Sequence, residues 1–408
     1  MNQSKLDTFK SFTNLVNPTM ANFDDLFDAR PMAPFSPLVI DLLNQVSERL
    51  MAQSHLREFP DVAAFAFWCR KSSISTMKAK YLDFGRRLGR GVIFHVAPKN
   101  VPVNFAYTLA VGLLAGNANI VRVPSAEFVQ VRMIADVFQY LLKTPNFVEL
   151  CNHVALIRYD KNESQLTTEL SQRCDVRVIW GGDRSIQEIR KSPISQRAFD
   201  VTFADRYSLC VIQADGYLSE GGYSKTAARF FNDTYLFDQD ACTAPHLILW
   251  IGSDVRVAQA KEIFWNQLQS VVESKYELQT ISAIDKLTTA YKFVSQNAKS
   301  QLVKSNDNLI TRIEIGSLES GIEEWRGSFG CFFEFQAPNF DVLAKIVNHR
   351  FQTLSCIGVA PSVLANYVHE KRMTGVDRVV PVGKTLDFTL NWDGYDLIIT
   401  LSRLISVI

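Results

Sequence analysis

The sequence predicts an α/β protein of two domains. The chain has 408 residues, which exceeds the size of one ordinary domain. Apolar residues make up 47% of it and charged residues 21%, so there is ample material for two cores. From residue 91 onward, short β-branched segments alternate with helical ones, an order typical of parallel sheets that helices cover on both faces.

Residues 1–90 predict a helical segment that packs on the domain after it. Met1–Pro34 is mixed and polar, and we expect loosely packed entry structure there. Pro37–Gln53 carries apolar residues three and four positions apart, which is the pattern of an amphipathic helix. Two further helices are predicted near Asp61–Arg70 and Ser75–Arg87.

Residues 91–214 predict a Rossmann-type nucleotide-binding domain. The predicted strands are Gly91–Val96, Asn119–Val123, Val154–Ile157, Arg177–Trp180 and Ser208–Ile212, with helices at Val103–Ala115 and Glu127–Leu142. Strands in this order form right-handed βαβ units, and such sheets bind ligands at the carboxyl ends of their strands. We therefore expect the loops after Val96, Val123 and Trp180 to line a binding site. His95 is interpreted as a residue of the core, or as one that supports the site from behind.

Two of these loops suit a phosphate group. Trp180, Gly181 and Gly182 end a strand and open a helix, so backbone amides can approach a pyrophosphate there. Arg122 and Ser125 follow the second strand, where the adenosine ribose of a dinucleotide lies, and an arginine there can pair with a 2′-phosphate. From the Gly-Gly turn alone, a plain strand-to-helix connection is the simpler interpretation, and both stay open.

Residues 215–390 predict the catalytic domain, because they contain Cys242 in the stretch Gln239-Asp-Ala-Cys-Thr-Ala-Pro-His246. Pro245 favours the first turn of a helix, which predicts Cys242 at or just before a helix N-terminus. The unpaired N–H groups and the dipole of a helix lower a thiol pKa there and favour a nucleophilic thiolate. Cysteine is also among the most buried residue types, so the stretch alone admits inert packing too.

His246 lies four residues after Cys242, which places both on one face of the predicted helix. It can lower the thiol pKa there or protonate a leaving thiolate, or it can pack in the core. The apolar end of the chain, residues 391–408, predicts a strand that returns to the core or pairs with another subunit. Further predicted elements are the strands Leu247–Ile251, Phe329–Phe335 and Gln352–Val359 and the helices Ala258–Ser274 and Asp341–His349.

Charge and cysteine usage exclude several classes of protein. The net charge is +1 and the pI is about 7.6, so nucleic acid is not an expected partner. The seven cysteines are scattered and form no C-x-x-C pair, which predicts a reducing, cytoplasmic location without a disulfide framework. The sequence predicts no signal peptide and no transmembrane segment. It also predicts no metal site, because no residues have the spacing of metal ligands.

Several ordered motifs run through most of the chain. They are residues 91–102 (GVIFHVAPKNVP), 114–122 (LAGNANIVR), 178–182 (VIWGG), 239–246 (QDACTAPH), 377–383 (DRVVPVG) and 392–396 (WDGYD). In this order and spacing they resemble the aldehyde dehydrogenase superfamily and, within it, the acyl-CoA reductase family typified by the fatty acid reductase of bacterial bioluminescence. The resemblance implies an aldehyde dehydrogenase-like fold, a nicotinamide nucleotide in the domain 91–214, and Cys242 as the nucleophile.

The resemblance also implies roles for the residues around the predicted site. Pro98-Lys-Asn-Val-Pro102 matches the superfamily's Pro-Trp-Asn-Phe-Pro loop, so Pro98 would lie at the cofactor and Asn100 would donate its side-chain amide to an oxyanion hole. The second donor of that hole would be the backbone N–H of Cys242.

The cofactor residues match the superfamily in part. Gly181 and Gly182 stand where the superfamily has Gly-Ser at the pyrophosphate helix. Arg122 and Ser125 lie near its Lys-Pro-Ser stretch beside the adenosine ribose. Because this chain reads Arg-Val-Pro-Ser, the lysine is missing in register, and the ribose contact stays open.

One departure from the superfamily points to the direction of the reaction. The stretch Thr202-Phe-Ala-Asp-Arg206 matches the region of the general-base glutamate but contains no glutamate. Oxidation of an aldehyde to an acid needs a base that activates water, whereas reduction of a thioester needs no water. The glutamate that anchors the nicotinamide ribose is not evident near Phe329-Gly330 either. We therefore predict reduction of a fatty acyl thioester to an aldehyde through an acyl-S-Cys242 intermediate, with NADPH, or else NADH, as cofactor.

The predicted acyl donor is acyl-CoA or an acylated protein. Acyl-protein synthetase or transferase subunits are the expected partners, and the chain itself is expected to form a homo-oligomer. Three alternatives stay open: an aldehyde dehydrogenase that works oxidatively, a cysteine acyltransferase or thioesterase that uses no nicotinamide, and a catalytically silent scaffold in an acyl-transfer complex.

Overall fold

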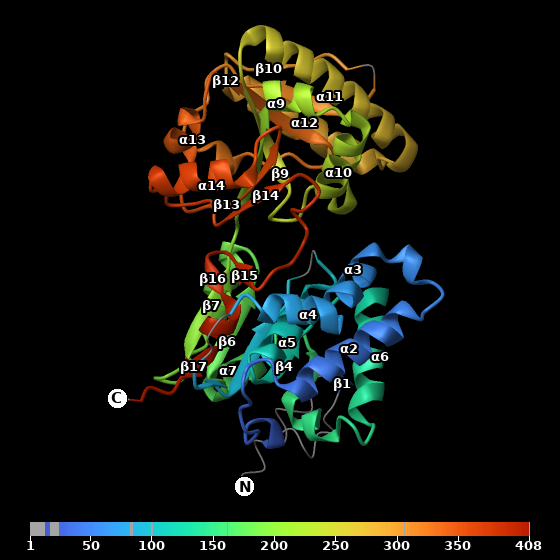
Figure 1. Cartoon of the computed structure of the whole chain (residues 1–408), viewed down its shortest axis with the longest axis vertical. Helices are drawn as coiled ribbons and strands as arrows, with labels where there is room; N and C mark the ends of the chain where they lie inside the picture. The colour runs from blue at the N-terminus through green and yellow to red at the C-terminus, as the bar shows by residue number, and fades with distance from the viewer. Residues whose placement is uncertain are drawn as a thin grey trace. The chain divides into compact units, whose positions relative to one another are not determined.

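The structure, a computed structural model, describes residues 13–16, 24–81, 85–98, 101–160, 162–305 and 307–407. The chain forms two compact units, which we call the first unit (residues 1–204 and 390–408) and the second unit (residues 205–389). Figure 1 traces both along the chain. The chain leaves the first unit after Ala204, ahead of the predicted limit at residue 214, and returns to it at Leu390.

The first unit is built on a six-stranded sheet in which the strand order reverses near the middle. Across the sheet the strands are β1 (Thr13–Val16), β5 (Val154–Arg158), β4 (Ala118–Arg122), β3 (Val92–Val96), β6 (Val176–Trp180) and β7 (Phe199–Phe203). β1 is antiparallel to β5, and the other neighbours are parallel. β3 lies between β4 and β6, so the order reverses there, as in dinucleotide-binding sheets. All residues of β3 are buried, as expected for a parallel strand covered on both faces.

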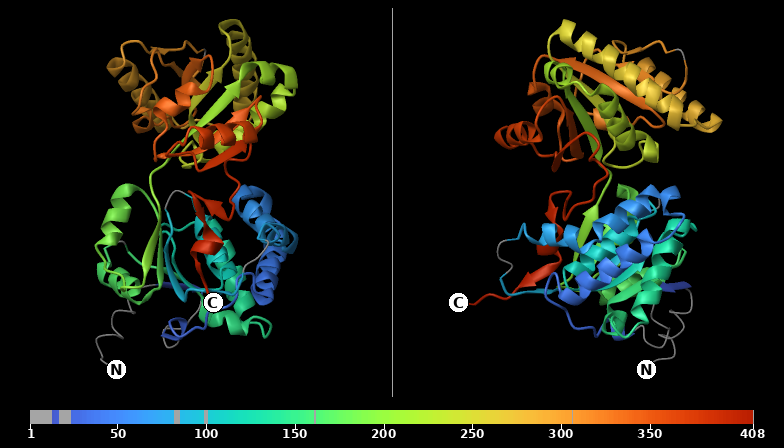
Figure 2. Two further views of the ribbon diagram at one scale, coloured as in Figure 1. Left: turned by 60° about the vertical axis from the view of Figure 1, so that its left-hand side comes forward. Right: turned by 45° about the vertical axis from the view of Figure 1, so that its right-hand side comes forward.

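Helices cover both faces of this sheet, and Figure 2 shows them from two further directions. α7 (Ser164–Arg173) and α8 (Asp183–Arg190) pack on the face that includes Phe94 and Val96. α5 (Asn104–Leu114) packs on β3 and β4 from the face to which His95 points. The other helices of this unit are α2 (Pro37–Met51), α3 (Pro60–Trp68), α4 (Lys71–Lys78) and α6 (Val129–Leu142), with short 3₁₀ turns η3 (Leu56–Glu58) and η4 (Val148–His153).

The end of the chain returns to the first unit. It forms the hairpin β15 (Asn391–Trp392) and β16 (Tyr395–Asp396), the short helix α15 (Leu397–Thr400) and β17 (Ser402–Leu404), which pairs antiparallel with β2 (Arg87–Gly89). The predicted long strand is therefore interrupted. The side chain of Asp396 accepts the N–H of Ile399 and so caps a helical turn in the middle of it.

The second unit holds a seven-stranded sheet with the same parallel character. Across the sheet the strands are β10 (Gln301–Leu302), β11 (Thr311–Glu314), β12 (Cys331–Ala337), β9 (Pro245–Ile251), β8 (Tyr207–Gln213), β13 (Phe351–Ile357) and β14 (Arg378–Pro381). β10 is antiparallel to β11, and the other pairs are parallel.

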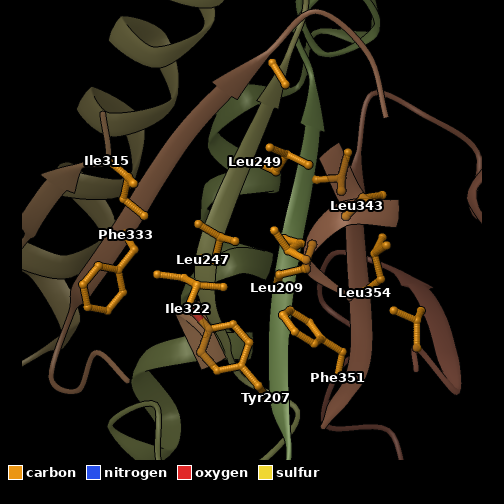
Figure 3. Close-up of a cluster of buried hydrophobic side chains, with 14 of the residues drawn as sticks. Tyr207, Leu209, Leu247, Leu249, Ile315, Ile322, Phe333, Leu343, Phe351 and Leu354 are labelled. Carbon is orange, nitrogen blue, oxygen red and sulfur yellow. The ribbon is translucent and has the colours of Figure 1, made fainter. Parts of the chain in front are cut away.

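Two apolar layers cover the faces of this second sheet. One contains the inward residues of α9 (Ala214–Glu220), α10 (Tyr223–Thr234) and α11 (Asp254–Lys275), and the other those of α12 (Thr280–Gln296), α13 (Asp341–Ile346) and α14 (Pro361–Glu370). Figure 3 shows the second layer, in which Leu209, Leu247 and Leu354 extend from three neighbouring strands together with Leu343 of α13. Successive side chains along each strand point alternately into one layer and the other, so both faces of the sheet are buried.

A fully buried carboxylate lies within this unit. Glu334 of β12 is 1% exposed, and its carboxylate accepts the indole N–H groups of Trp250 (2.8 Å) and Trp265 (3.1 Å). The Nε–H of Arg312 donates to its other oxygen at 2.6 Å, and the ammonium of Lys261 lies at 3.8 Å. A buried charge is tolerated only with such partners, so Glu334 and these four side chains form one polar network in an apolar layer.

Most predicted helices and strands are confirmed, and the differences have identifiable causes. The predicted helix Ser75–Arg87 is wrong, because α4 ends at Lys78 and Arg87 belongs to strand β2. The predicted strand Ser208–Ile212 exists as β8 but belongs to the sheet of the second unit. β7 was not predicted, since Asp200 interrupts its apolar pattern and pairs instead with Arg177 at 2.8 Å. Among the described residues, no helix has both the length and the apolar content needed to cross a membrane.

Candidate active site

Cys242 lies in a tight turn between η5 (Tyr235–Phe237) and β9. The N–H of Ala244 donates to the carbonyl of Ala241 at 2.9 Å, which closes the turn around Cys242. The predicted helix is wrong, because Pro245 opens strand β9, a position that proline tolerates as well as a first helical turn. The helix dipole therefore does not act on the thiol, and His246 shares no helical face with it.

Exposure distinguishes Cys242 from most of the other cysteines. Five of the seven are buried, and only Cys151 and Cys242 are half-buried. The thiol of Cys151 donates to the carbonyl of Leu142 at 3.0 Å, and burial raises its pKa. Reactive cysteines are partly exposed, whereas buried ones are inert. Cys242 therefore meets the exposure that a nucleophile needs.

The backbone of Cys242 is held from the neighbouring strand. The hydroxyl of Ser208 in β8 donates to the carbonyl of Cys242 at 2.7 Å and accepts the N–H of Thr353 in β13 at 3.2 Å. One side chain thus ties the turn to two strands. The sequence gives no signal for Ser208, because the contact depends on the pairing of strands far apart in the chain.

His246, the second residue of β9, is 2% exposed and neutral. Its Nδ1 lies 2.9 Å from the carbonyl of Gly327, and its ring stacks on Tyr207 with centroids 5.3 Å apart. Since a carbonyl only accepts, Nδ1 carries the proton. Burial, together with the charge of Arg326, lowers the pKa of His246 to about 3. A neutral ring does not stabilise a thiolate by charge, so the catalytic role of His246 stays a prediction, and the contact with Gly327 is its visible function.

Arg326 places a positive charge beside the same turn. Its guanidinium donates to the carbonyl of Arg206 at 2.6 Å. Burial and the neighbouring Asp238 raise the pKa of Asp240, and the charge of Arg326 opposes this shift. Arg326 lies in none of the sequence motifs and was not predicted.

In the first unit, the predicted cofactor loops follow neighbouring strands. β6 ends at Trp180, and α8 begins at Asp183 with Gly182 as its N-terminal cap. The predicted strand–turn–helix order around Gly181 is therefore confirmed. β3 and β6 are adjacent and end at the same edge, where doubly wound sheets bind their ligands. Pro98 follows β3 and is half-buried, while Asn100 lies outside the described residues.

A buried polar chain supports Trp180 from behind. Its indole N–H donates to the hydroxyl of Thr108 at 3.2 Å, and that hydroxyl lies 2.8 Å from Nδ1 of His95. The Nε2 of His95 donates to the side-chain carbonyl of Asn119 at 3.0 Å, and burial lowers the pKa of the ring to about 4, so it is neutral at pH 7. Trp180 also stacks on Phe203, with ring centroids 3.7 Å apart. These contacts fix the indole plane at the end of β6.

Protonation of His95 is expected to destabilise the first unit in acid. Burial lowers the pKa of His95 from 6.5 to about 4, so the unfolded chain binds this proton first. The stability is present above the unfolded pKa of 6.5 and is lost as the pH falls toward 4, by about 3 kcal/mol at ~1.36 kcal/mol per pKa unit. Urea unfolding of wild type and His95→Gln across this pH range measures the difference in slope. An identical pH dependence in both would refute the assignment.

Arg122, the last residue of β4, is half-buried and stacks over the ring of Tyr159, with 4.5 Å between its guanidinium carbon and the ring centroid. No carboxylate among the described residues lies within ion-pair distance of it. Next to it, Arg158 at the end of β5 donates to the carbonyl of Pro124 at 3.1 Å. Ser125 is exposed. Two cations thus lie at adjacent strand ends, where the second strand of such sheets meets the adenosine ribose.

The predicted site residues divide between the two units. Cys242 and His246 belong to the second unit, and the six predicted cofactor residues, Pro98, Arg122, Ser125, Trp180, Gly181 and Gly182, belong to the first. Within the second unit the structure adds Ser208, Gln239 and Arg326 to the surroundings of Cys242.

A family model described as acyl-CoA reductase (LuxC) matches residues 22–406. The chain belongs to the LuxC acyl-CoA reductase family. The match covers both units, including Cys242 and every predicted cofactor residue. It establishes an oxidoreductase of the kind that reduces fatty acyl groups to aldehydes. No curated protein sequence matches this chain.

Solved structures confirm the fold of this LuxC family member. Aldehyde dehydrogenase 21 from Physcomitrella patens, in complex with succinate, has a TM-score of 0.65 at 14% identity over 95% of this chain and 90% of its own. Lactaldehyde dehydrogenase from Escherichia coli has 0.62 at 9% identity, over 94% and 87%. NAD-dependent benzaldehyde dehydrogenase from Corynebacterium glutamicum has 0.60 at 11% identity, over 96% and 93%. The predicted aldehyde dehydrogenase-like fold is confirmed.

Proposed function

We propose that this chain reduces an acyl thioester to an aldehyde through an acyl-S-Cys242 intermediate, with a reduced nicotinamide nucleotide as hydride donor. The observation that carries the proposal is Cys242 itself, a half-buried thiol in a turn held by Ser208, within a chain of the LuxC family. Partly exposed, positioned thiols are the ones that act as nucleophiles.

The reaction then has two stages. The Cys242 thiolate attacks the thioester carbonyl, the carbonyl oxygen becomes an oxyanion, and the donor's thiolate leaves as the acyl-enzyme forms. A reduced nicotinamide supplies one hydride to the acyl carbon. Hydride addition makes the carbonyl oxygen an oxyanion again, and this thiohemiacetal oxyanion re-forms the C=O bond as its C–S bond breaks, which releases the aldehyde and returns the thiolate of Cys242.

The residues of the first unit suit a dinucleotide. In this proposal, Gly181 and Gly182 bring backbone amides to the pyrophosphate at the start of α8, and Pro98 and Trp180 lie along the cofactor. Arg122 and Ser125 would meet the adenosine ribose, and the lack of an ion-pair partner for Arg122 among the described residues leaves its charge for a 2′-phosphate. This favours NADPH over NADH.

Reduction is favoured over oxidation by the composition of the β7 end. Residues 202–206 contain no glutamate that could activate water against the acyl-enzyme. We propose acyl-CoA or an acylated protein as the donor, and acyl-protein synthetase or transferase subunits as partners. The seven scattered cysteines, which form no C-x-x-C pair, suit a reducing compartment such as the cytoplasm. The exposed apolar residues Leu404, Ile405 and Val407 suit contact between subunits of a homo-oligomer.

The test is the product. Purified protein is supplied with acyl-CoA thioesters of several chain lengths and with NADPH or NADH. Any aldehyde is trapped as its hydrazone and identified by mass spectrometry. One aldehyde for each nicotinamide oxidised is expected, with NADPH the better cofactor. Acid formed from aldehyde and NADP⁺, without the reductive reaction, would instead identify an oxidative aldehyde dehydrogenase. Thioester cleavage without nicotinamide oxidation would identify an acyltransferase or thioesterase.

Asn100→Ala is expected to lower kcat by about 100- to 1,000-fold, because it removes one donor of the oxyanion hole. The variant should keep its circular dichroism spectrum and its cooperative unfolding. Asn44→Ala on helix α2, which removes a 2.8 Å hydrogen bond to Glu48, is the matched control and should leave kcat unchanged. Turnover within about threefold of wild type in a folded Asn100→Ala variant would exclude this residue from the oxyanion hole.

A further inference from the structure

Gln239, three residues before Cys242, is buried in an unusual backbone conformation. Gln239 is only 1% exposed, and its φ angle of 64° lies in the left-handed region. The preceding Asp238 has a φ of 52° and lies there too. Consecutive non-glycine residues in this region are strained and persist only where their surroundings hold them. Strain of this kind is typical of segments that position reacting groups.

The side-chain amide of Gln239 uses its full hydrogen-bonding capacity. Its Oε1 accepts the backbone N–H groups of Gly330 at 2.9 Å and Cys331 at 3.1 Å. Its Nε2 donates to the carbonyls of Pro245 and Cys331, both at 3.2 Å. An amide offers two donor hydrogens and two acceptor sites, and all four are satisfied here. One side chain thus joins the segment before Cys242 to the first residues of β9 and β12.

Backbone contacts extend this connection on both sides. The N–H of Gln239 donates to the carbonyl of Thr234 at 2.8 Å, and the N–H of Phe329 donates to the carbonyl of Asp238 at 3.1 Å. The buried ammonium of Lys286 donates to the carbonyl of Phe329 at 2.9 Å, so the facing loop is fixed from behind as well. The segment before the turn therefore rests on a rigid support.

We infer that Gln239 is a positioning residue for the Cys242 thiol, which it sets in place by bonding the strained segment Asp238–Gln239 to β9 and β12. This inference rests on the proposed function, in which Cys242 attacks a thioester. Ser208 fixes the carbonyl of Cys242 itself, and Gln239 fixes the chain that enters the turn. Attack on a thioester depends on the placement of the thiol and of the oxyanion donors, and a misplacement of about 1 Å costs on the order of a hundredfold in rate.

The test compares two reactions of Cys242: acylation by a thioester, which depends on exact placement of the thiol, and alkylation by a small reagent, which does not. Gln239→Gly removes the amide but adopts the left-handed conformation without strain, so it separates the side chain from the backbone. Gln213→Ala is the control, because Gln213 also holds a backbone N–H with its side chain, that of Gly216 at 2.7 Å, but at the other end of β8. Two rates are measured by intact-protein mass: acylation of Cys242 by acyl-CoA in a single turnover, and alkylation by iodoacetamide under native conditions.

Gln239→Gly is expected to lower the acylation rate about a hundredfold while the KM for acyl-CoA stays unchanged. The same variant is expected to be alkylated faster than wild type, because release of the segment exposes a half-buried thiol to a small reagent. Gln213→Ala should match wild type in both reactions. Unchanged acylation overturns the inference, and so does alkylation that falls together with acylation, which would show a hidden or unfolded thiol.

A failure of the proposed function is distinguishable from a failure of this inference. If wild type is acylated by no donor, the proposed function fails, and the alkylation rates alone then decide the role of Gln239. Faster alkylation of Gln239→Gly than of wild type and Gln213→Ala would keep the inference. Equal rates in all three would overturn it.

Discussion

Cys242→Ala is expected to lower kcat for aldehyde formation on the order of 10⁴- to 10⁶-fold, because every bond change of the proposed reaction passes through this thiol. The side chain lies in a turn that is closed by backbone bonds and by Ser208, so its removal leaves the supporting contacts intact. Unfolding by urea should therefore be nearly unchanged. Nicotinamide oxidation at saturating acyl-CoA measures the loss.

Cys151→Ala is the matched control for this prediction. Cys151 is the other half-buried cysteine of the chain, and it lies in the first unit with its thiol bonded to the carbonyl of Leu142. Its replacement should leave kcat unchanged. If Cys242→Ala retained a tenth of the wild-type rate, or if Cys151→Ala lost as much as Cys242→Ala, the nucleophile would be misassigned.

Glu334→Ala is expected to destabilise the second unit by about 3–5 kcal/mol, because it leaves a partly buried arginine and two buried indole N–H groups without their acceptor. The carboxylate is fully buried and binds Arg312, Trp250 and Trp265. Removal of one member of a buried ion pair costs far more stability than an exposed ion pair contributes. Urea unfolding followed by tryptophan fluorescence measures the change.

Glu314→Ala is the control for the buried network. Glu314 accepts from Lys261 at 2.8 Å but has a side chain that is 36% exposed, so its loss is expected to cost about 1 kcal/mol or less. Equal losses of stability in Glu314→Ala and Glu334→Ala would contradict the assignment of the network as buried.

The fold could be predicted from the sequence where one strand or helix determines its own pattern. β3 is rich in β-branched residues and apolar except for His95, and α2 has apolar residues at helical spacing, so the sequence predicts both. β8 is an apolar strand like β3, yet it belongs to the second sheet, because the pairing of a strand depends on residues far away in the chain. Local composition predicts that a segment forms a strand, but it does not predict which strand lies next to it in a sheet.

The chemistry of the candidate site stays a prediction, and its local structure could be predicted only in part. The motif indicates Cys242, whereas Pro245 predicts the start of a helix and in the fold begins β9. Proline fixes φ at a value that both elements accept, so the tertiary pairing with β8 and β12 decides between them. Ser208 and Arg326 were missed, because each acts on Cys242 or its neighbours through contacts that no spacing encodes.

The most direct measurement is the intact mass of the protein after incubation with a panel of acyl-CoA thioesters, without nicotinamide, beside Cys242→Ala. A mass gain equal to the acyl group is expected in wild type only, and the acyl group is expected to leave as aldehyde when NADPH is added. An adduct that also forms on Cys242→Ala would contradict Cys242 as the nucleophile. An adduct on wild type that NADPH never discharges would contradict reduction as its fate.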